Sequence, residues 1–552
     1  MLTRRQFLGA TSVGVLASGS WAALAAKAID DPAVTAIFAH GVASGEPTAE
    51  SVLLWSRIST DRPVVKVSWA VATDMAMKNI VQEGVVTTDQ KQDYCVKVEV
   101  PGLSSGSTYY YQFNFAGTYS EIGRTKTLAE GDLSELKIAV VSCSNLPFGF
   151  FNAYEDIAKR SDIDVVLHLG DYLYEYGPDG YGGAVGARIG RNHEPPRETI
   201  TLADYRIRHG QYKADRASRL MHAAHPLIAI WDDHESANNP YKEGAQNHQP
   251  ESEGSWHDRR EASLQAYFEW MPVNDPKHSE DRMRMWRRFE FGSLASLVTL
   301  ETRHTGRDEQ VDYAKYLPEL TDAEKAQHFK DTVLWDERRN MLSEDMEAFY
   351  KAAIASRKTH WQLVANQIPM ARTHVPPLSD IIHPAVPEDN DPLAAERNAL
   401  QVLSRFNLPI YTDTWDGYPA ARERFYAMNK SLGCQDLVVL TGDSHSFWLN
   451  RLFDKTGEPM GVEIGTTGVT SPGDFIYFNE QIAHEMDNRL ASHNDEILWT
   501  DGINKGYTLL TINRQAIDID YIVVSTILSE DYSVNTIKKT RLIKEGQTLK
   551  IS

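Results

Sequence analysis

Two short stretches of this chain share one unusual form: an apolar run typical of a buried strand stops at a Gly-Asp pair. The first, Val166–Glu175, has the sequence VLHLGDYLYE, and the second, Val438–Phe447, has the sequence VVLTGDSHSF. In α/β folds, the carboxyl ends of buried strands open into the crevice that holds the functional site. A Gly-Asp pair at that position places a carboxylate in the crevice, so these stretches predict where the site lies.

Both stretches carry a second side chain that binds metals. Tyr174 follows Asp171 by three residues, and His445 follows Asp443 by two. A single Gly-Asp pair after a strand is best explained as a helix N-cap, and a lone tyrosine as core packing. Two such stretches in one chain, each adding tyrosine or histidine to a carboxylate, favour a metal site.

The overall composition limits the function of the chain. With 552 residues it is long enough for two or three domains, and its 42% hydrophobic content is sufficient for large cores. The formal charge of −20 argues against a nucleic-acid partner. Because an acidic surface does not attract phosphate anions, a phosphate-handling site here needs local positive charge, which bound cations can supply.

The first 28 residues have the features of an export signal. Thr3–Leu8 (TRRQFL) matches the twin-arginine pattern, and an apolar run rich in Ala, Gly and Ser follows to Ala26. Small-residue cleavage patterns fit after Ala25 or after Ala28. The run is too short and too rich in Gly and Ser for a transmembrane anchor. We therefore expect the twin-arginine translocase to export the folded chain to the periplasm or the extracellular space, with no membrane anchor after cleavage.

The chain has three cysteines, Cys95, Cys143 and Cys434. An odd number in an exported protein leaves at least one thiol unpaired. A Cys95–Cys434 disulfide and two buried free thiols are both compatible with the sequence. Cys143 is different, because it directly follows a strand predicted over residues 136–142.

Residues 29–130 predict an all-β domain. Turn residues separate short alternating strands at the spacing of a fibronectin-like or immunoglobulin-like sandwich. Strands are expected at residues 51–55, 64–71, 94–100 and 108–115. This region contains no constellation of catalytic residues, so we expect a structural or accessory role for it.

From residue 131 to about residue 527, strands alternate with helices, beginning with a β-α-β unit over residues 136–170. Further strands are expected at residues 226–231, 294–300, 361–365, 437–441, 507–512 and 516–524. Residues 528–552 are expected to form a C-terminal tail. We expect substrate choice to lie in an insert at residues 177–197 and in segments 240–280 and 371–425.

Five of these strands end in side chains that bind metals. The residues are Cys143; Asp171 and Tyr174; Asp233 and His234; Gln367; and Asp443 and His445. Thiolate, phenolate, imidazole and carboxylate donors together suit trivalent iron, and a set made only of carboxylate and amide oxygens suits Ca²⁺ or Mg²⁺. Each residue alone has an ordinary structural explanation. Their occurrence at successive strand ends favours one shared site.

These motifs resemble those of the alkaline phosphatase D (PhoD-type) family, a branch of the calcineurin-like metallophosphoesterases. The resemblance rests on His40–Pro47 (HGVASGEP) with Ser51–Arg57, Ser142–Asn145 (SCSN), Gly170–Tyr176 (GDYLYEY), Trp231–Glu235 (WDDHE) with Asn238–Asn239, and Gly442–His445 (GDSH). It implies an α/β (α+β) fold. A metallophosphatase domain over residues 131–527, with two β-sheets in a sandwich flanked by helices, follows the small β-sandwich domain.

The resemblance also implies roles for individual residues. The implied Fe³⁺ ligands are Cys143, Asp171, Tyr174 and His445. The implied ligands of one or two Ca²⁺ ions are Asp171, Asp233, Gln367 (or its neighbour Asn366) and Asp443. These cofactors are expected in preference to Mg²⁺ or Zn²⁺. The implied catalytic residues are His234, as phosphate contact or proton donor, and Asn145. Candidate phosphate contacts are Asn238 and Arg303. The Leu300–Arg303 motif (LETR) departs from the family pattern by having Glu301 in place of Asp.

The implied activity is hydrolysis of phosphate monoesters, diesters or both by a hydroxide held on the metals, for phosphate acquisition. One alternative is a phospholipase-like or teichoic-acid-directed phosphodiesterase on the same scaffold. Another is a non-catalytic binding protein that calcium stabilises. The joint presence of the four implied Fe³⁺ ligands argues against the binding protein, because such a protein does not need an iron-type ligand set.

Overall fold

The computed structural model describes residues 21–276, 282–385 and 391–552. The predicted twin-arginine motif lies outside the described residues. The first described element, helix α2 (Trp21–Ile29), contains both predicted cleavage positions. Ala25 and Ile29 of this helix are buried, and Ile29 packs with Leu220 of helix α7 (Arg216–Ala224). Among the described helices, none has the length and apolar character needed to cross a membrane.

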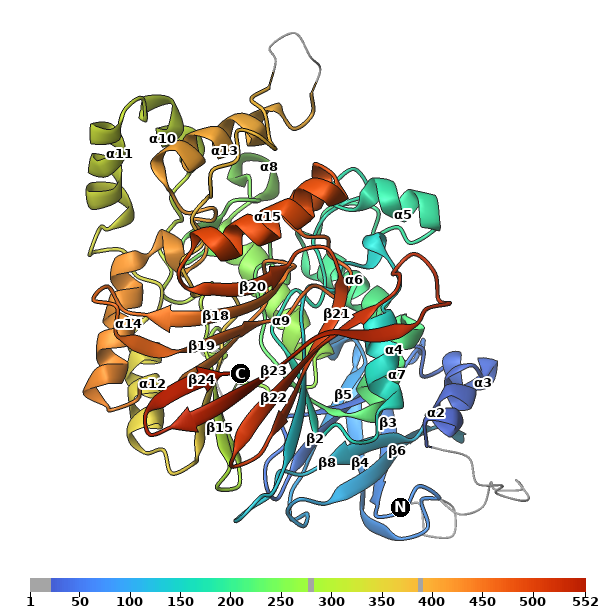
Figure 1. Cartoon of the computed structure of the whole chain (residues 1–552). Coiled ribbons are helices and arrows are strands. Elements are labelled where there is room, and N and C mark those ends of the chain that lie inside the picture. The colour runs from blue at the N-terminus through green and yellow to red at the C-terminus, as the bar shows by residue number, and fades with distance from the viewer. Residues whose placement is uncertain (1–20, 277–281, 386–390) are drawn as a thin grey trace.

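Two large β-sheets form the centre of the molecule (Figure 1). The ten-stranded sheet has the spatial order β24 (Thr548–Ile551), β23 (Val534–Glu545), β22 (Ala516–Val524), β21 (Lys505–Ile512), β9 (Leu136–Val141), β10 (Val165–His168), β11 (Pro226–Ala229), β1 (Val42–Gly45), β2 (Val52–Arg57) and β5 (Cys95–Val100). The seven-stranded sheet has the order β14 (Arg288–Phe291), β15 (Ala295–Thr299), β16 (Trp361–Ala365), β17 (Leu437–Thr441), β19 (Pro459–Gly465), β18 (Phe447–Phe453) and β20 (Ile497–Asp501).

The two sheets face each other across one apolar core. This core contains side chains from both sheets, including Ile138, Leu167, Leu297, Leu363 and Val438. Helices α4 (Asn152–Lys159), α7 and α9 (Trp256–Trp270) pack on the other face of the ten-stranded sheet, and helices α12 (Glu344–Ala355) and α14 (Pro419–Ser431) pack on that of the seven-stranded sheet (Figure 1). The predicted fold, a two-sheet sandwich flanked by helices and preceded by an all-β region, is confirmed.

The central strands are buried on both sides, since helices cover one face and the second sheet covers the other. Their sequences are accordingly near-continuous apolar runs, such as VVLH in β10 and LVVLT in β17. Strands β9, β10, β11 and β1 run parallel, and so do β15, β16, β17 and β19. Each parallel run therefore brings its carboxyl ends, and the loops that follow them, to one edge of its sheet.

The N-terminal region is joined to the rest of the chain through the ten-stranded sheet. Its own five-stranded sheet consists of β3 (Val64–Ala72), β4 (Ile80–Asp89), β6 (Thr108–Phe115), β7 (Thr118–Tyr119) and β8 (Gly123–Lys126). That sheet packs against β1, β2 and β5. Strand β1 pairs in parallel with β11, with Ser44 opposite Pro226. Gly45 is required at this junction because a Cβ atom there would lie 2.1 Å from the carbonyl oxygen of Pro272.

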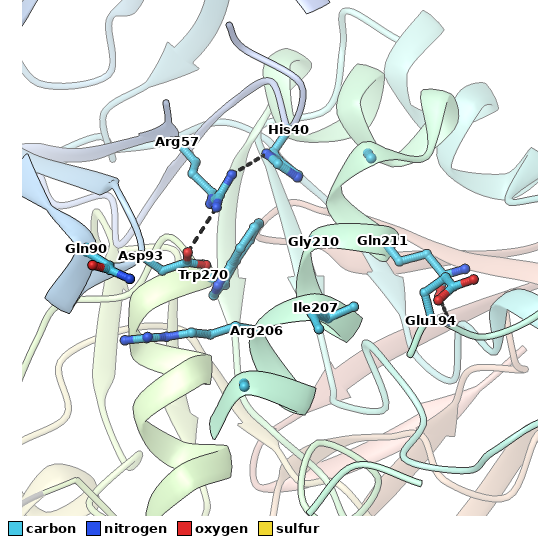
Figure 2. Close-up of a pocket in the computed structure, with 12 residues that line it drawn as sticks. His40, Arg57, Gln90, Asp93, Glu194, Arg206, Ile207, Gly210, Gln211 and Trp270 are labelled. Atoms are coloured by element: carbon cyan, nitrogen blue, oxygen red, sulfur yellow. Dashed lines mark hydrogen bonds and ion pairs between the residues drawn. The ribbon is translucent and has the colours of Figure 1, made fainter. Parts of the chain in front are cut away.

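A crevice of about 580 Å³ lies in the seam between the N-terminal region and the rest of the chain (Figure 2). The N-terminal region lines it with His40, Arg57 and Asp93, and the rest of the chain lines it with Trp270 of α9 and with residues of α6 (Leu202–Ala214). The Arg57 guanidinium lies 5.0 Å from the centre of the Trp270 ring and forms an ion pair of 2.9 Å with Asp93. The His40 ring packs edge-on against Trp270 at 4.9 Å. The N-terminal motif residues therefore help to hold the two regions together.

Residues 528–552, predicted as a tail, contribute two strands to the ten-stranded sheet. Strand β23 pairs antiparallel with β22, and β24 pairs with β23. Leu542 is fully buried in the core between the sheets, although most of β23 is half-buried or exposed. The polar composition of β23 conceals it in the sequence, because only one of its side chains is fully buried.

We expect the substitution Leu542→Ala to lower the free energy of unfolding by about 2–5 kcal/mol, because it leaves a cavity between the sheets. Leu528→Ala is the matched control, since Leu528 lies in the same segment but is 50% exposed. This control should change the free energy by less than about 0.5 kcal/mol. Urea denaturation measures both values, and equal losses would contradict a core role for residues 528–552.

Candidate metal centre

The carboxyl ends of parallel strands from both sheets meet at one edge of the sandwich. Cys143 lies two residues after β9, Asp171 three residues after β10, and Asp233 four residues after β11. From the seven-stranded sheet, Asp443 lies two residues after β17. Because both sheets direct these ends to the same edge, side chains that are 300 positions apart in the sequence come together.

One cluster contains Cys143, Asp171 and His445. Its sulfur, carboxylate and imidazole ligand atoms all lie within 4.8 Å of one another. The Tyr174 hydroxyl donates to Asp171 Oδ2 at 2.9 Å and lies 3.2 Å from His445 Nε2, while Ser471 donates to that hydroxyl at 2.8 Å. The structure therefore brings together the four residues predicted to bind Fe³⁺.

The surrounding backbone fixes the direction of the His445 imidazole. Nδ1 lies 2.9 Å from the carbonyl oxygen of Pro472, so we assign the proton to Nδ1, which leaves Nε2 facing the cluster as an acceptor. The carbonyl oxygen of His445 itself accepts from Lys505 Nζ and from Thr467 Oγ1, both at 2.8 Å. A histidine that binds a metal through one nitrogen commonly donates its other N–H to a carbonyl in this manner.

A second group of acidic residues adjoins the first cluster. Ligand atoms lie within 4.8 Å of one another in Asp171, Asp233 and His234, and again in Asp232, Asp233 and Asp443. The fully buried Arg303 donates to Asp443 Oδ1 at 2.6 Å and to Asp232. Burial nevertheless raises the pKa of Asp232 to about 6 and that of Asp443 well above its usual value, despite the opposing effect of Arg303. Arg303 alone therefore does not offset the burial of these carboxyl groups, and a further positive charge is needed to keep them ionised.

Four of these residues have left-handed backbone conformations. The φ angles are +57° at Cys143, +53° at Asp171, +64° at Asp443 and +56° at His445. Such a conformation costs a non-glycine residue about 1–3 kcal/mol, so the surrounding structure has to impose it. Part of that restraint is a hydrogen bond of 3.2 Å from the Cys143 N–H to the Gly170 carbonyl oxygen. The strain is concentrated where the side chains converge.

Glu235 connects two of the turns that follow the strands. Its buried carboxylate accepts hydrogen bonds from the backbone N–H groups of Asp171 (3.0 Å), Tyr172 (2.7 Å) and Asp232 (2.9 Å). Burial raises the pKa of Glu235 to about 7, against the effect of these N–H groups, which favour the ionised form. One carboxylate thus holds the turn after β10 against the turn after β11.

His234 is positioned by Tyr174 and Glu175. Its ring stacks on the Tyr174 ring with centroids 4.1 Å apart, and its Nδ1 lies 2.7 Å from Glu175 Oε2. Burial alone would lower the pKa of His234, but the surrounding carboxylates, chiefly Asp233 and Glu175, raise it well above its usual value. These carboxylates favour the protonated imidazole, whose Nε2 lies 3.7 Å from Asp233 Oδ2.

Comparison with known proteins identifies the family. The family model described as PhoD-like phosphatase matches residues 138–521, and the model of the N-terminal domain of these phosphatases matches residues 23–129. The chain belongs to the PhoD-like phosphatase family. Alkaline phosphatase D of Bacillus subtilis (strain 168) is 32% identical over 516 residues, which cover 90% of this chain and 79% of that protein. The solved structure of PhoD matches with a TM-score of 0.75 and 29% identity, over 94% of this chain and 92% of that chain. The resemblance inferred from the motifs is confirmed, and the chain is a phosphoesterase hydrolase.

The donor set of this PhoD-like phosphatase fits bound cations. Burial, followed by the charge of Asp171, raises the pKa values of the Cys143 thiol and the Tyr174 phenol well above their usual range. These groups therefore become anionic ligands only beside a positive charge. Asn145 is fully buried, and in the described part of the chain neither atom of its side-chain amide has a hydrogen-bond partner. Because buried amides normally have hydrogen-bond partners, a bound ligand would explain why this one has none in the protein. The groups present can thus bind metals, and the identities Fe³⁺ and Ca²⁺ stay predictions.

Three other predicted residues make protein contacts. Gln367 Oε1 accepts from Thr302 at 2.6 Å, and its amide nitrogen donates to the carbonyl oxygens of Trp231 and Leu300. Its alternative, Asn366, donates to a backbone carbonyl oxygen and accepts from Trp415. The side chain of Asn238 donates to Gln246. The ligand and phosphate-binding roles of these residues stay predictions.

Sequence reasoning missed the carboxylates that organise the centre without being proposed as ligands. Glu175 and Glu235 are fully or almost fully buried and act through a histidine and through backbone N–H groups. Both stand in the quoted motifs, and so does Asp232, beside the predicted ligand Asp233. The density of acidic residues in WDDHE is the signal that was available. It does not reveal which carboxylate faces the site.

We expect Glu235→Gln to destabilise the protein by about 1.5–3 kcal/mol and to weaken metal binding about 10- to 100-fold. The reason is that a glutamine amide cannot accept from all three N–H groups, so the turn after β10 loses part of its restraint. Urea denaturation and calorimetric titration with Ca²⁺ measure the two effects. Glu530→Gln, at an exposed position, is the control, and unchanged Ca²⁺ affinity in Glu235→Gln would contradict the positioning role.

Proposed function

We propose that this chain is an exported, metal-dependent phosphatase that hydrolyses phosphate monoesters, diesters or both. The observation that carries the proposal is the convergence of Cys143, Asp171, Tyr174 and His445 beside a second carboxylate group. The mixed donors of the first cluster favour Fe³⁺, and the oxygen donors of the second favour one or two Ca²⁺ ions. Cations held by these residues would neutralise charge on the phosphoryl group and activate the attacking water.

His234 is the proton donor to the leaving alkoxide in this proposal. The Glu175 carboxylate fixes the imidazole through Nδ1, so Nε2 is the nitrogen that can deliver a proton. The neighbouring carboxylates keep that proton on the ring, because they raise the pKa of His234. General-acid assistance of this kind contributes about 10²–10⁴-fold to the rate.

Asn145 and Arg303 complete the proposed contacts. The buried amide of Asn145 has both a donor and an acceptor available, which suits a phosphoryl oxygen or a cation. Arg303 holds Asp232 and Asp443 in place, and its Nη1, which makes no hydrogen bond to the described residues, lies 3.8 Å from an Asp413 carboxylate oxygen. That nitrogen is therefore the part of Arg303 that can contact phosphate.

The proposed setting is phosphate acquisition outside the cytoplasm. The twin-arginine pattern at Thr3–Leu8 supports export by the translocase to the periplasm or the extracellular space. The acidic composition of the chain does not attract phosphate esters from a distance, so local cations have to bind them. This supports a site that depends on metals for substrate binding as well as for chemistry.

We expect His234→Asn to lower kcat about 10²–10⁴-fold for an alkyl phosphodiester, and much less for bis(p-nitrophenyl) phosphate. The difference arises because nitrophenolate leaves without being protonated, whereas an alkoxide needs a proton. Steady-state kinetics on the two substrates measure the effect. His257→Asn, whose side chain is 70% exposed, is the control, and equal losses on both esters would rule out proton donation.

We expect Cys143→Ser to remove iron from the purified protein, while Cys434→Ser keeps it. The two cysteines form a matched pair, because both are fully buried and unpaired, but only Cys143 lies among other ligand atoms. Elemental analysis measures the metal content, and a visible absorption band from an iron-bound Tyr174 gives a second readout. An iron content that Cys143→Ser leaves unchanged would contradict the ligand assignment.

A further inference from the structure

A short β-hairpin follows the turn after β11. Strand β12 (Pro240–Tyr241) pairs with β13 (Gly244–Ala245), and the Asn247 N–H then donates to the Asn238 carbonyl oxygen at 3.1 Å. Asn238 and Asn247 therefore lie opposite each other at the open end of the hairpin. This pairing brings a backbone N–H of the first and the side-chain amide of the second to the same place.

Both asparagines bind the oxygen of Glu175 that His234 does not. His234 Nδ1 lies 2.7 Å from Glu175 Oε2. The other oxygen, Oε1, accepts from the Asn238 backbone N–H and from Asn247 Nδ2, each at 2.8 Å. Because Glu175 is fully buried, these contacts replace the water that an exposed carboxylate would bind. With both oxygens engaged, the carboxylate cannot turn without losing hydrogen bonds, so the imidazole is held with it.

Asn247 is itself held in place by the protein. Its Nδ2 also donates to Glu198 Oε1 at 3.1 Å, so both N–H bonds of the amide are used. The buried Arg259 donates to Glu198 at 2.7 Å and to the Asn247 carbonyl oxygen at 2.9 Å. The amide is thus fixed before any substrate binds, as a residue that positions a catalytic group has to be.

The restraint on the imidazole matters because a competing acceptor lies near it. His234 Nε2 is 3.7 Å from Asp233 Oδ2. A small turn of an unrestrained ring would direct the Nε2–H to Asp233 and away from a substrate oxygen. The contact between Nδ1 and Glu175 opposes this turn only while Glu175 itself stays in place.

We propose that Asn247 is a positioning residue for proton donation: by holding the Glu175 carboxylate, it keeps Nε2 of His234 directed at the leaving oxygen of the ester. This inference rests on the proposed function, in which His234 protonates the leaving alkoxide. It adds a third residue, from the segment 240–280, to the pair of His234 and Glu175. The effect of Asn247 on the rate then depends on the leaving group, because only a poor leaving group needs the proton.

Pairs of esters that differ only in leaving group test the proposal. p-Nitrophenyl phosphate and ethyl p-nitrophenyl phosphate release nitrophenolate, whereas ethyl phosphate and diethyl phosphate release an alkoxide. Asn247→Leu keeps the size of the side chain and removes both N–H donors. We expect it to lower kcat about 10- to 100-fold for the alkyl ester that the enzyme hydrolyses, the range of one lost hydrogen bond to a charged group. The kcat for the matching nitrophenyl ester should fall less than about 2-fold.

A double variant shows whether Asn247 acts through His234. Adding Asn247→Leu to His234→Asn should lower kcat for the alkyl ester by less than a further factor of about 2, because the group that Asn247 positions is already absent. Additive losses would place Asn247 outside this chain of contacts and would overturn the proposal.

Controls separate positioning from a loss of structure. Gln249→Leu makes the same kind of change at an exposed position of the same segment and should leave all four esters unaffected. The thermal midpoint and the metal content of Asn247→Leu should equal those of the wild type. If that variant does not fold, Asn247→Asp, which keeps the shape and lacks the donors, should show the same selective loss. Equal losses on both leaving groups, or no loss on the alkyl ester, would overturn the role of Asn247.

Failure of the proposed function has a different signature. A metal-loaded wild type that hydrolyses none of the four esters would overturn the phosphatase activity. A wild type that hydrolyses only the nitrophenyl esters, or equal losses on both leaving groups in His234→Asn, would overturn proton donation by His234. Each of these results also removes the inference about Asn247.

Discussion

Buried negative charge is the constraint on which the centre of this protein depends. Asp171, Asp232, Asp233 and Asp443 converge in a space with little access to water. Isolated carboxylates in such a place protonate or destabilise the fold. The fold supplies part of the compensation through the Arg303 guanidinium and the His234 imidazole. The groups that converge here could hold cations, and in the proposed function such cations would supply the remainder.

The sandwich architecture explains how these groups stay in place. Two parallel runs of strands direct their carboxyl ends to one edge, and Glu235 ties two of the following turns together through backbone N–H groups. Cys143 and His445 lie in left-handed conformations that a flexible loop would abandon. The hydrogen bonds that stabilise these turns also hold the residues with left-handed backbone conformations in place. Their side chains therefore stay directed at one another.

The sequence predicts the parts of this arrangement that follow from strand ends. Cys143, Asp171, Tyr174 and His445 are foreseeable because a buried strand followed by a polar turn directs side chains to one sheet edge. The contacts of Gln367 are not, since they depend on the rotamer and on Thr302, which comes from another strand end. Strand β23 is missed because its mostly exposed residues give no apolar alternation. The joining of β1 to β11 is missed because β1 is only four residues long and fully buried, so its sequence VASG shows no alternation that would predict a strand.

The pairing of β1 with β11 also constrains how the chain folds during translation. Ser44 pairs with Pro226, 182 positions later, and β9 has β21, from near the end of the chain, as one of its neighbours. During translation, the first strands to leave the ribosome therefore wait with open edges until their neighbours are synthesised. An open strand edge pairs readily with other chains. A nascent chain of this protein is consequently exposed to edge-to-edge pairing until β11 and β21 have been synthesised.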